Sequence, residues 1–108
     1  MQNILFVCSR NQWRSPTAES VFKNHNAINV RSAGTSSKAK RTVTHVDIQW
    51  ADQILVMENK HRSRLKADFP RLMEFKPVHV LGIPDEFQYM DPELVETLED
   101  LVPSVLEI

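Results

Sequence analysis

A cysteine and an arginine six positions apart, Cys8 and Arg14, lie in the segment "VCSRNQWRS", between an apolar run and a stretch suited to start a helix. The chain has no other cysteine. A loop that runs into a helix N-terminus directs several backbone N–H groups to one point, and the helix dipole adds partial positive charge there. Such a loop binds phosphate-like anions and stabilises a thiolate over a thiol. The segment therefore has the parts for attack of sulfur on phosphorus.

Other residues of the segment fit this chemistry. The planar guanidinium of Arg14 can hold two phosphate oxygens. Ser15 is predicted to donate a hydrogen bond to the sulfur of Cys8 and to cap the following helix. Asn11 suits a turn position with positive φ. A lone cysteine at a strand end is more often a small buried apolar residue, so the hypothesis depends on the elements around the loop.

Those elements are predicted by alternating apolar runs and helix-start signals. Short runs rich in apolar or β-branched residues predict strands over 3–7, 27–34, 53–57 and 76–82. The helix-start signals predict helices over 16–25, from Thr44 through Trp50, after Asn59 and after Asp91-Pro92. The alternation predicts an α/β fold: a four-stranded parallel sheet flanked by helices on both faces, with the phosphate-binding loop after the first strand. Ligands bind beyond the carboxyl ends of such strands.

The last predicted helix has an apolar face and an internal proline. The residues expected on that face are Leu94, Leu98, Leu101 and Val105. Pro103 is expected to end or kink the helix near its last turn.

Composition narrows the class of protein. The 108 residues predict a single domain over 1–108. A formal net charge of -1 argues against nucleic acid or an anionic membrane as partner. The chain opens without the features of a signal peptide, and one cysteine cannot form an internal disulfide. The cysteine and histidine residues lack metal-ligand spacing. We therefore expect a cytoplasmic protein without a metal or other cofactor.

The segment "VCSRNQWRSPTAE" closely resembles the phosphate-binding loop of low-molecular-weight protein tyrosine phosphatases, in which a cysteine and five further residues precede Arg-Ser-Pro. Three later segments also resemble this family: "VRSAGTS" (30–36) its second strand and turn, "ADQILVMENKHRSRL" (51–65) its third strand and helix, and "IPDEF" (83–87) its general-acid loop. In order and spacing the resemblance covers nearly the whole chain.

The resemblance implies a metal-independent hydrolase that acts on a phosphotyrosine protein or another aryl or alkyl phosphate and releases inorganic phosphate. It implies that Cys8 is the nucleophile, that Arg14 binds the phosphoryl oxygens and that Asp85 is the general acid. The residues implied to bind phosphate or support the loop are Ser9, Arg10, Asn11, Gln12, Trp13, Ser15 and Ser32.

Several positions depart from the family pattern. The interval between the second and third strands is short, and no histidine occurs between 33 and 44, so we expect a cleft wall and a histidine that supports the loop to be lost. His61 and the other histidines are expected to be surface or structural residues. Trp13 replaces a second loop cysteine and either packs behind the loop or faces a ligand. Phe87 is a candidate ring wall for the substrate. These departures put the preference for phosphotyrosine in question.

Two alternatives to a phosphatase follow from the same residues. A thiol-dependent arsenate reductase shares the fold and a similar loop, but it needs further cysteines, which this chain lacks. A non-catalytic phosphate-binding module needs neither a cysteine nor an acid, and both are present here. A tyrosine-type phosphatase is therefore the preferred hypothesis.

Substitution of the nucleophile provides the first prediction. The Cys8→Ser variant should fold and bind phosphate or vanadate but show no measurable turnover, because a serine hydroxyl in the same field stays un-ionised. Arg14→Lys should also be severely impaired, since a point charge cannot replace the planar fork. Steady-state kinetics on an aryl phosphate test both, and retained turnover by Cys8→Ser would exclude a covalent mechanism.

Overall fold

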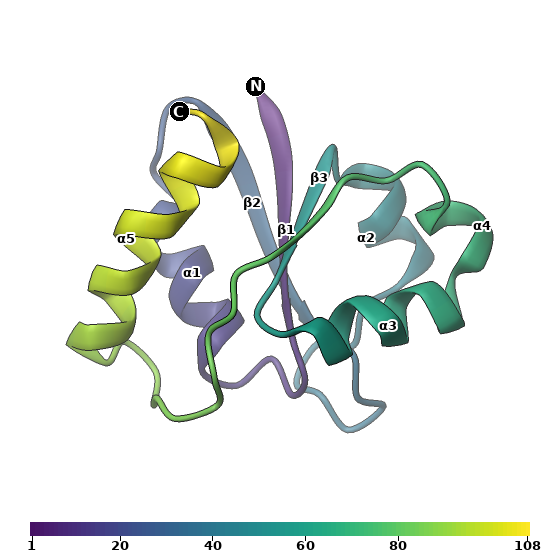
Figure 1. Ribbon diagram of the computed structural model, residues 1–108, viewed down its shortest axis with the longest axis horizontal. Coiled ribbons are helices and arrows are strands. Elements are labelled where there is room, and N and C mark those ends of the chain that lie inside the picture. The colour runs from purple at the N-terminus through teal and green to yellow at the C-terminus, as the bar shows by residue number, and fades with distance from the viewer.

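The computed structural model describes residues 1–108, which form a four-stranded parallel sheet with helices on both faces (Figure 1). The strands are β1 (Gln2–Cys8), β2 (Ile28–Gly34), β3 (Gln53–Val56) and β4 (Val78–Val80). The helices are α1 (Arg14–Phe22), α2 (His45–Trp50), α3 (Asn59–Asp68), α4 (Pro70–Met73) and α5 (Pro92–Leu106). All neighbouring strands are parallel, in the order β2-β1-β3-β4. The predicted fold class is confirmed.

The central strand β1 supplies side chains to a core on each face of the sheet, as the period of two in a strand requires. Ile4, Phe6 and Cys8 belong to a cluster beneath α1 and α5. Leu5 and Val7 belong to a second cluster beneath α2, α3 and α4. Figure 1 shows these two helical layers on opposite sides of the sheet. Burial on both faces explains why this strand is a continuous apolar run.

The carboxyl end of β1 lies where the strand order reverses. The chain passes from β1 to β2 on one side and then crosses to β3 on the other. In the register of the sheet, Cys8 pairs with Gly34 of β2, and Val7 pairs with Val56 of β3. The end of β1 is therefore bordered by the turns that follow both neighbouring strands, the usual place for a ligand in such a sheet.

Two helix starts differ from the sequence prediction. Helix α1 begins at Arg14, with Trp13 as its N-cap, rather than after Ser15, and it ends at Phe22. Helix α3 begins at Asn59 itself, and its N-cap is Glu58. The start of α2 after Thr44 and that of α5 after Asp91 are confirmed, and in both cases the side chain of the capping residue accepts a backbone N–H.

Helix α5 continues through Pro103 to Leu106, so of the two expected effects of this proline, the end of the helix does not occur at Pro103. Its buried residues are Leu94, Leu98, Val102 and Leu106. The predicted Leu101 and Val105 are only partly buried beside them. Anchoring of Val102 and Leu106 in the core holds the last turn after the proline. The four-residue α4 was not predicted, although proline at its first position is a start signal. No helix combines the length and apolar character needed to cross a bilayer.

Gly34, at the end of β2, is required by a close approach of the loop after β1. A Cβ atom at this position would lie 2.5 Å from the Ser9 carbonyl oxygen, 2.6 Å from Ala39 Cβ and 2.9 Å from the Asn11 nitrogen. Two of these three atoms belong to backbone, which cannot turn aside as a flexible side chain can. The loop after β1 therefore lies directly against the end of β2, and only glycine leaves room for it.

The second prediction concerns this contact. Gly34→Ala should lower the free energy of unfolding by roughly 1–3 kcal/mol, as overpacking does, and should weaken phosphate binding because the loop must shift. Urea denaturation and phosphate titration measure the two effects. The double variant Gly34→Ala/Ala39→Gly removes the side-chain clash but not the clash with Ser9, so most of both losses should remain. Full recovery in the double variant would show that the backbone contact is unimportant.

Candidate active site

The loop from Cys8 to Arg14 presents unused backbone donors. The carbonyl oxygens of Cys8, Ser9 and Arg10 accept hydrogen bonds from the backbone N–H groups of Thr35, Ser36 and Lys40, at 2.9 to 3.0 Å. Within a peptide unit the N–H points opposite to the C=O. The N–H groups of the next three residues in the chain therefore point away from segment 35–40. Throughout 9–13 no backbone N–H has a hydrogen-bond partner within the protein. Consecutive free N–H groups of this kind form an anion-binding concavity.

Cys8 and the polar residues behind the loop form a buried network. The Cys8 Sγ lies 2.9 Å from Ser15 Oγ. Asn11 has φ 52°, as predicted, and its side-chain amide donates to Ser15 Oγ and to Ser32 Oγ, both at 3.0 Å. Because the NH2 group of Asn11 can only donate, the Ser15 hydroxyl keeps its own proton, for which the sulfur at 2.9 Å is a nearer acceptor than the Ala33 carbonyl oxygen at 3.4 Å. The network therefore fixes the position of the sulfur at the base of the loop.

The role of Ser15 explains why it is not the N-cap of α1. Its hydroxyl faces the sulfur and Asn11 instead of the free N–H groups of the first helical turn. The N-cap, Trp13, has no side-chain capping hydrogen bond. The start of the helix is therefore left open toward the loop, which suits an anion better than a capped end does.

Arg14 is held from one side and left free on the other. Its side chain is 3% exposed, and Nη1 donates to a carboxylate oxygen of Glu58 and, at 2.8 Å, to the carbonyl oxygen of Ile83. Its Nε lies 3.7 Å from Asp85 Oδ1, and Nη2 has no hydrogen-bond partner within the protein. The edge formed by Nε and Nη2 is thus available for two oxygens of a phosphoryl group.

Glu58 also connects Arg14 to the other end of the loop through His61. The Glu58 backbone N–H donates to His61 Nδ1 at 3.0 Å, and His61 Nε2 lies 2.9 Å from Ser9 Oγ. An Nδ1 that accepts a hydrogen bond carries no proton, so in neutral His61 the proton is on Nε2 and is donated to Ser9. The proton of the Ser9 hydroxyl is then free for an anion in the loop.

The electrostatics of these two residues agree with that assignment. Burial, followed by the charge of Arg14, lowers the pKa of His61 to about 4 despite the opposing charge of Glu58. Burial raises the pKa of Glu58, but the hydrogen bond and charge of Arg14, together with Lys60 and His61, outweigh it, and the net pKa is lowered. Near neutral pH, Glu58 is therefore a carboxylate and His61 is uncharged.

A small cavity of about 40 Å³ opens above the sulfur. It is lined by Cys8, Ser9, Arg10, Gln12, Trp13, Arg14 and Asp85. This volume is a few times the roughly 10–15 Å³ that one water requires, so it accommodates a group the size of a phosphoryl. The predicted nucleophile, anion-binding arginine and acid are thus brought to one place. Asn11, Ser15 and Ser32 lie behind the loop, as the resemblance implied.

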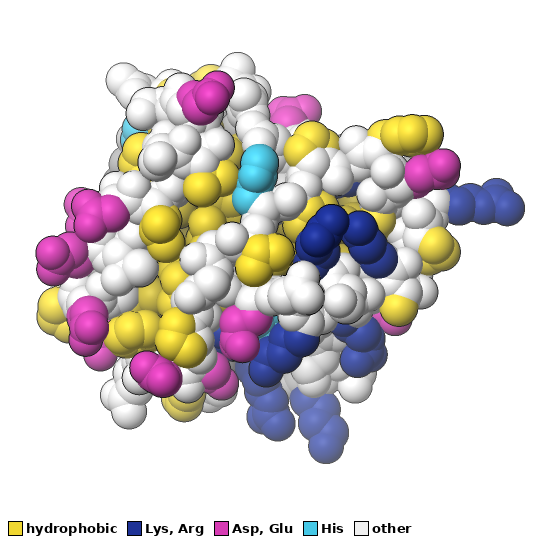
Figure 2. Space-filling model, viewed as in Figure 1, with side chains coloured by type: hydrophobic (Ala, Val, Ile, Leu, Met, Phe, Trp, Pro, Cys, Tyr) yellow, Lys and Arg dark blue, Asp and Glu magenta, His cyan; other side chains and the backbone are white.

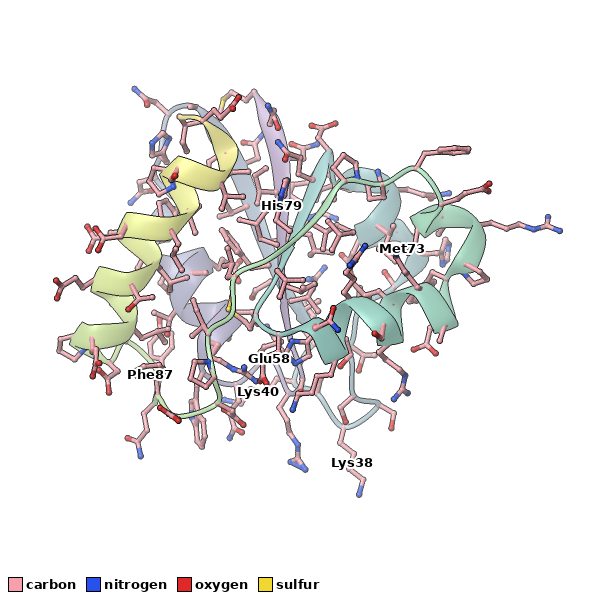
Figure 3. The ribbon with its side chains drawn as sticks, in the orientation of Figure 1. Lys38, Lys40, Glu58, Met73, His79 and Phe87 are labelled. Atoms are coloured by element: carbon pink, nitrogen blue, oxygen red, sulfur yellow. The ribbon has the colours of Figure 1, made fainter.

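Trp13 and Phe87 have different positions relative to this cavity. Trp13 is 38% exposed and lines the cavity, which decides between its two predicted positions in favour of the ligand side. Phe87 packs against the core beneath α1 and α5 and does not line the cavity, so it is not the predicted ring wall. Figure 3 shows it on the α5 side of the molecule.

Glu58 and His61 are functional candidates that the sequence analysis missed. The predicted loss of a supporting histidine is corrected by His61, which supports the loop from α3 instead of from the interval after β2. Figure 3 shows Glu58 at the start of α3. The sequence did contain a signal for both residues, because they follow a buried strand, and the carboxyl ends of the strands in a parallel sheet form the edge where ligands bind. No group of three or more His, Cys, Asp and Glu side chains is arranged to hold a metal ion.

The third prediction follows from the lowered pKa of His61. The folded protein binds this proton less readily than the unfolded chain does, so His61 should reduce stability as pH falls from about 6.5 toward 4. Thermal unfolding at several pH values should show a loss of melting temperature in this window that is smaller in His61→Gln. His25→Gln, at a half-buried position on the loop after α1, is the control. An identical pH dependence in wild type and His61→Gln would contradict the assignment.

Sequence comparison gives a match for the first part of the chain, which includes the loop after β1, and structure comparison gives matches for the whole fold. Residues 3–49 match the family model of low molecular weight phosphotyrosine protein phosphatases. A comparison with curated protein sequences gives no match.

Solved structures resemble the chain along nearly its whole length. The tyrosine phosphatase Wzb from Escherichia coli K30, in complex with phosphate, has a TM-score of 0.78 at 20% identity, over 99% of this chain and 98% of that one. The YwlE arginine phosphatase from Geobacillus stearothermophilus has a TM-score of 0.72 at 22% identity, over 99% and 89%. A YwlE mutant from Bacillus subtilis has a TM-score of 0.71 at 26% identity, over 97% and 99%.

The loop with Cys8, the parallel sheet that carries it and these matches all point to the same group of proteins. Residues 3–49 resemble the low molecular weight phosphotyrosine protein phosphatases, and the whole chain has the fold of the tyrosine phosphatase Wzb.

Proposed function

We propose that the protein hydrolyses phosphotyrosine in a protein substrate through a phosphocysteine intermediate and releases inorganic phosphate. The observation that carries this proposal is the shared cavity of Cys8 Sγ, the free edge of Arg14 and the carboxylate of Asp85, beside a row of unused backbone N–H groups. These are a nucleophile, a clamp for the phosphoryl oxygens and a proton donor.

In the first step the Cys8 thiolate attacks phosphorus, an S–P bond forms and the P–O bond to the tyrosine ring breaks. Arg14 and the loop N–H groups hold the three equatorial oxygens as charge develops on them. Asp85, in its protonated form, gives its proton to the departing phenolate oxygen. The Ser15 hydroxyl, 2.9 Å from the sulfur, stabilises the thiolate before attack and when it leaves again.

In the second step a water attacks the phosphocysteine and Asp85, now a carboxylate, accepts its proton. The S–P bond breaks, the thiolate is restored and inorganic phosphate leaves. Asp85 suits both steps because its side chain is 56% exposed at the rim of the cavity, where substrate and water can reach it.

A ring substrate is favoured by Trp13. Its exposed indole lies at the rim of the cavity and offers a face on which a phenyl ring can stack. Phosphoarginine is the second candidate, because Gln12 and Asp85 add a polar and an acidic group to the same rim, which suits a guanidinium. The likeness in fold to a YwlE arginine phosphatase agrees with this candidate. Arsenate reduction remains disfavoured, since Cys8 is the only thiol.

Two related expectations belong to the same proposal. Cys8 acts only as a free thiol, so we place the protein in a reducing compartment, the cytoplasm. All four strands belong to one sheet that carries a core on each face, which supports a single phosphatase domain over 1–108.

The fourth prediction distinguishes the two candidate acids, Asp85 and Asp91. Asp91 caps α5 by accepting the Glu93 N–H at 2.9 Å, and it does not line the cavity. Asp85→Asn should therefore lower turnover by roughly 10²–10⁴-fold, more with phenyl phosphate than with nitrophenyl phosphate, since phenol is the poorer leaving group. Asp91→Asn should have little effect, because asparagine caps nearly as well.

Metal-free kinetics on both aryl phosphates, with Cys8→Ser as the inactive reference, measure these effects. Circular dichroism checks that each variant is folded. A folded Asp91→Asn that loses the rate while Asp85→Asn keeps it would contradict the assignment. A wild-type protein inactive on aryl phosphates but active on phosphoarginine peptides would favour the second candidate.

A further inference from the structure

A second, larger hollow adjoins the catalytic cavity on the His61 side of the loop. Its volume is about 570 Å³, and it is lined by Ser9, Thr35, Ser36, Ser37, Lys60, His61, Ser63 and Arg64. None of these side chains is hydrophobic. Ser9 also lines the catalytic cavity, so the two spaces share a wall. A substrate with its phosphoryl group above Cys8 therefore has its neighbouring groups within reach of this polar hollow.

The charges in the hollow are positive and incompletely neutralised. Arg64 donates from Nε to Asp68 at 2.8 Å, and its two terminal nitrogens have no hydrogen-bond partner within the protein. Lys60 is 62% exposed, and its ammonium lies 3.8 Å from a Glu58 oxygen that Arg14 already holds. A guanidinium with free terminal nitrogens binds a carboxylate or phosphate through two parallel hydrogen bonds.

Hydroxyl groups around these cations complete an anion-binding lining. The side chains of Thr35, Ser37 and Ser63 form no hydrogen bond within the protein, so their hydroxyls are free to donate to a ligand. An apolar side chain would find no apolar partner here. Figure 2 shows Lys and Arg side chains gathered at the lower right, below α3, and Asp and Glu side chains along the left edge, over α5. The hollow therefore lies on the side of the molecule where the Lys and Arg side chains gather.

We propose that this hollow binds a second anionic group of the substrate, a carboxylate of an acidic residue that flanks the phosphotyrosine. The proposal rests on the proposed phosphatase activity and adds the substrate class: phosphotyrosine in an acidic peptide segment. Lys60 and Arg64 bind the flanking anion, and the free hydroxyls of the hollow add hydrogen bonds to it. A second phosphate on the same segment has the same chemistry and fits the same lining.

The test compares peptides that differ only in their flanks. Wild-type kcat/KM is measured for nitrophenyl phosphate and for phosphotyrosine peptides with neutral, glutamate and phosphoserine flanks. We expect the glutamate peptide to exceed the neutral one by about tenfold, and this ratio to fall several-fold in Lys60→Gln/Arg64→Gln. Arg64→Gln is also measured alone, because Lys60 lies 3.8 Å from Glu58 and its removal can disturb the Arg14–Glu58 pair. A larger gain for the phosphoserine peptide alone, with none for glutamate, would overturn the carboxylate assignment.

The matched control is Lys23→Gln/Arg71→Gln, which removes the same charge from exposed positions outside the hollow. It should leave the ratio unchanged. If the ratio of kcat/KM for the glutamate peptide to that for the neutral peptide falls equally in both double variants, the preference comes from long-range attraction and the proposal is overturned. A ratio of one in the wild-type protein would also overturn it. Titration of the peptides into Cys8→Ser provides a readout that does not need turnover. If nitrophenyl phosphate is not hydrolysed at all, the proposed function fails, while the binding preference still decides on the hollow.

Discussion

The ion pair of Arg14 and Glu58 is the interaction on which the candidate active site depends. A guanidinium with a side chain only 3% exposed is stable only with a partner, because an unpaired charge is costly to bury. Glu58 supplies that partner from the first turn after β3. Because Nη1 is used for Glu58 and the Ile83 carbonyl, the orientation of the guanidinium is fixed and its opposite edge faces the cavity. The pair therefore orients a phosphate ligand before any phosphate is bound.

The carboxylate of Glu58 also places a negative charge near a site for anions, which weakens the field of Arg14. The structure compensates for this with neutral donors. The free N–H groups of 9–13 contribute partial positive charge without adding a cation, and neutral His61 passes a hydrogen bond to Ser9. Preorganised dipoles of this kind need no rearrangement during the reaction. Anion binding is thus shared between one oriented cation and many backbone dipoles.

Sequence patterns predicted the local parts of this arrangement better than the contacts between distant parts. The positive φ of Asn11 and the Asp91 cap follow from side-chain preferences over a few residues, and both are present. Glu58 and His61 were missed because their partners lie 44 and 52 residues earlier in the chain, and only the alignment of β1 with β3 brings them together. For Ser15 the predicted contact with the Cys8 sulfur is present at 2.9 Å, whereas the predicted cap is absent, because the helix starts one residue before Ser15. The requirement for Gly34 has the same origin, since it arises from the loop crossing the end of β2.

These distant contacts fix the loop from two sides. Segment 35–40 holds three of its carbonyl oxygens, and His61 holds Ser9 from the side of β3. A loop with five unused N–H groups would gain hydrogen bonds by turning its peptide planes toward water or its own carbonyls, and the contacts with 35–40 prevent this. Since the unused donors are the ones that receive the anion, a ligand meets N–H groups that are already oriented. The turns that follow β2 and β3 therefore maintain the loop in its binding conformation. The position of Cys8 depends on these turns as much as on the residues that Cys8 contacts directly.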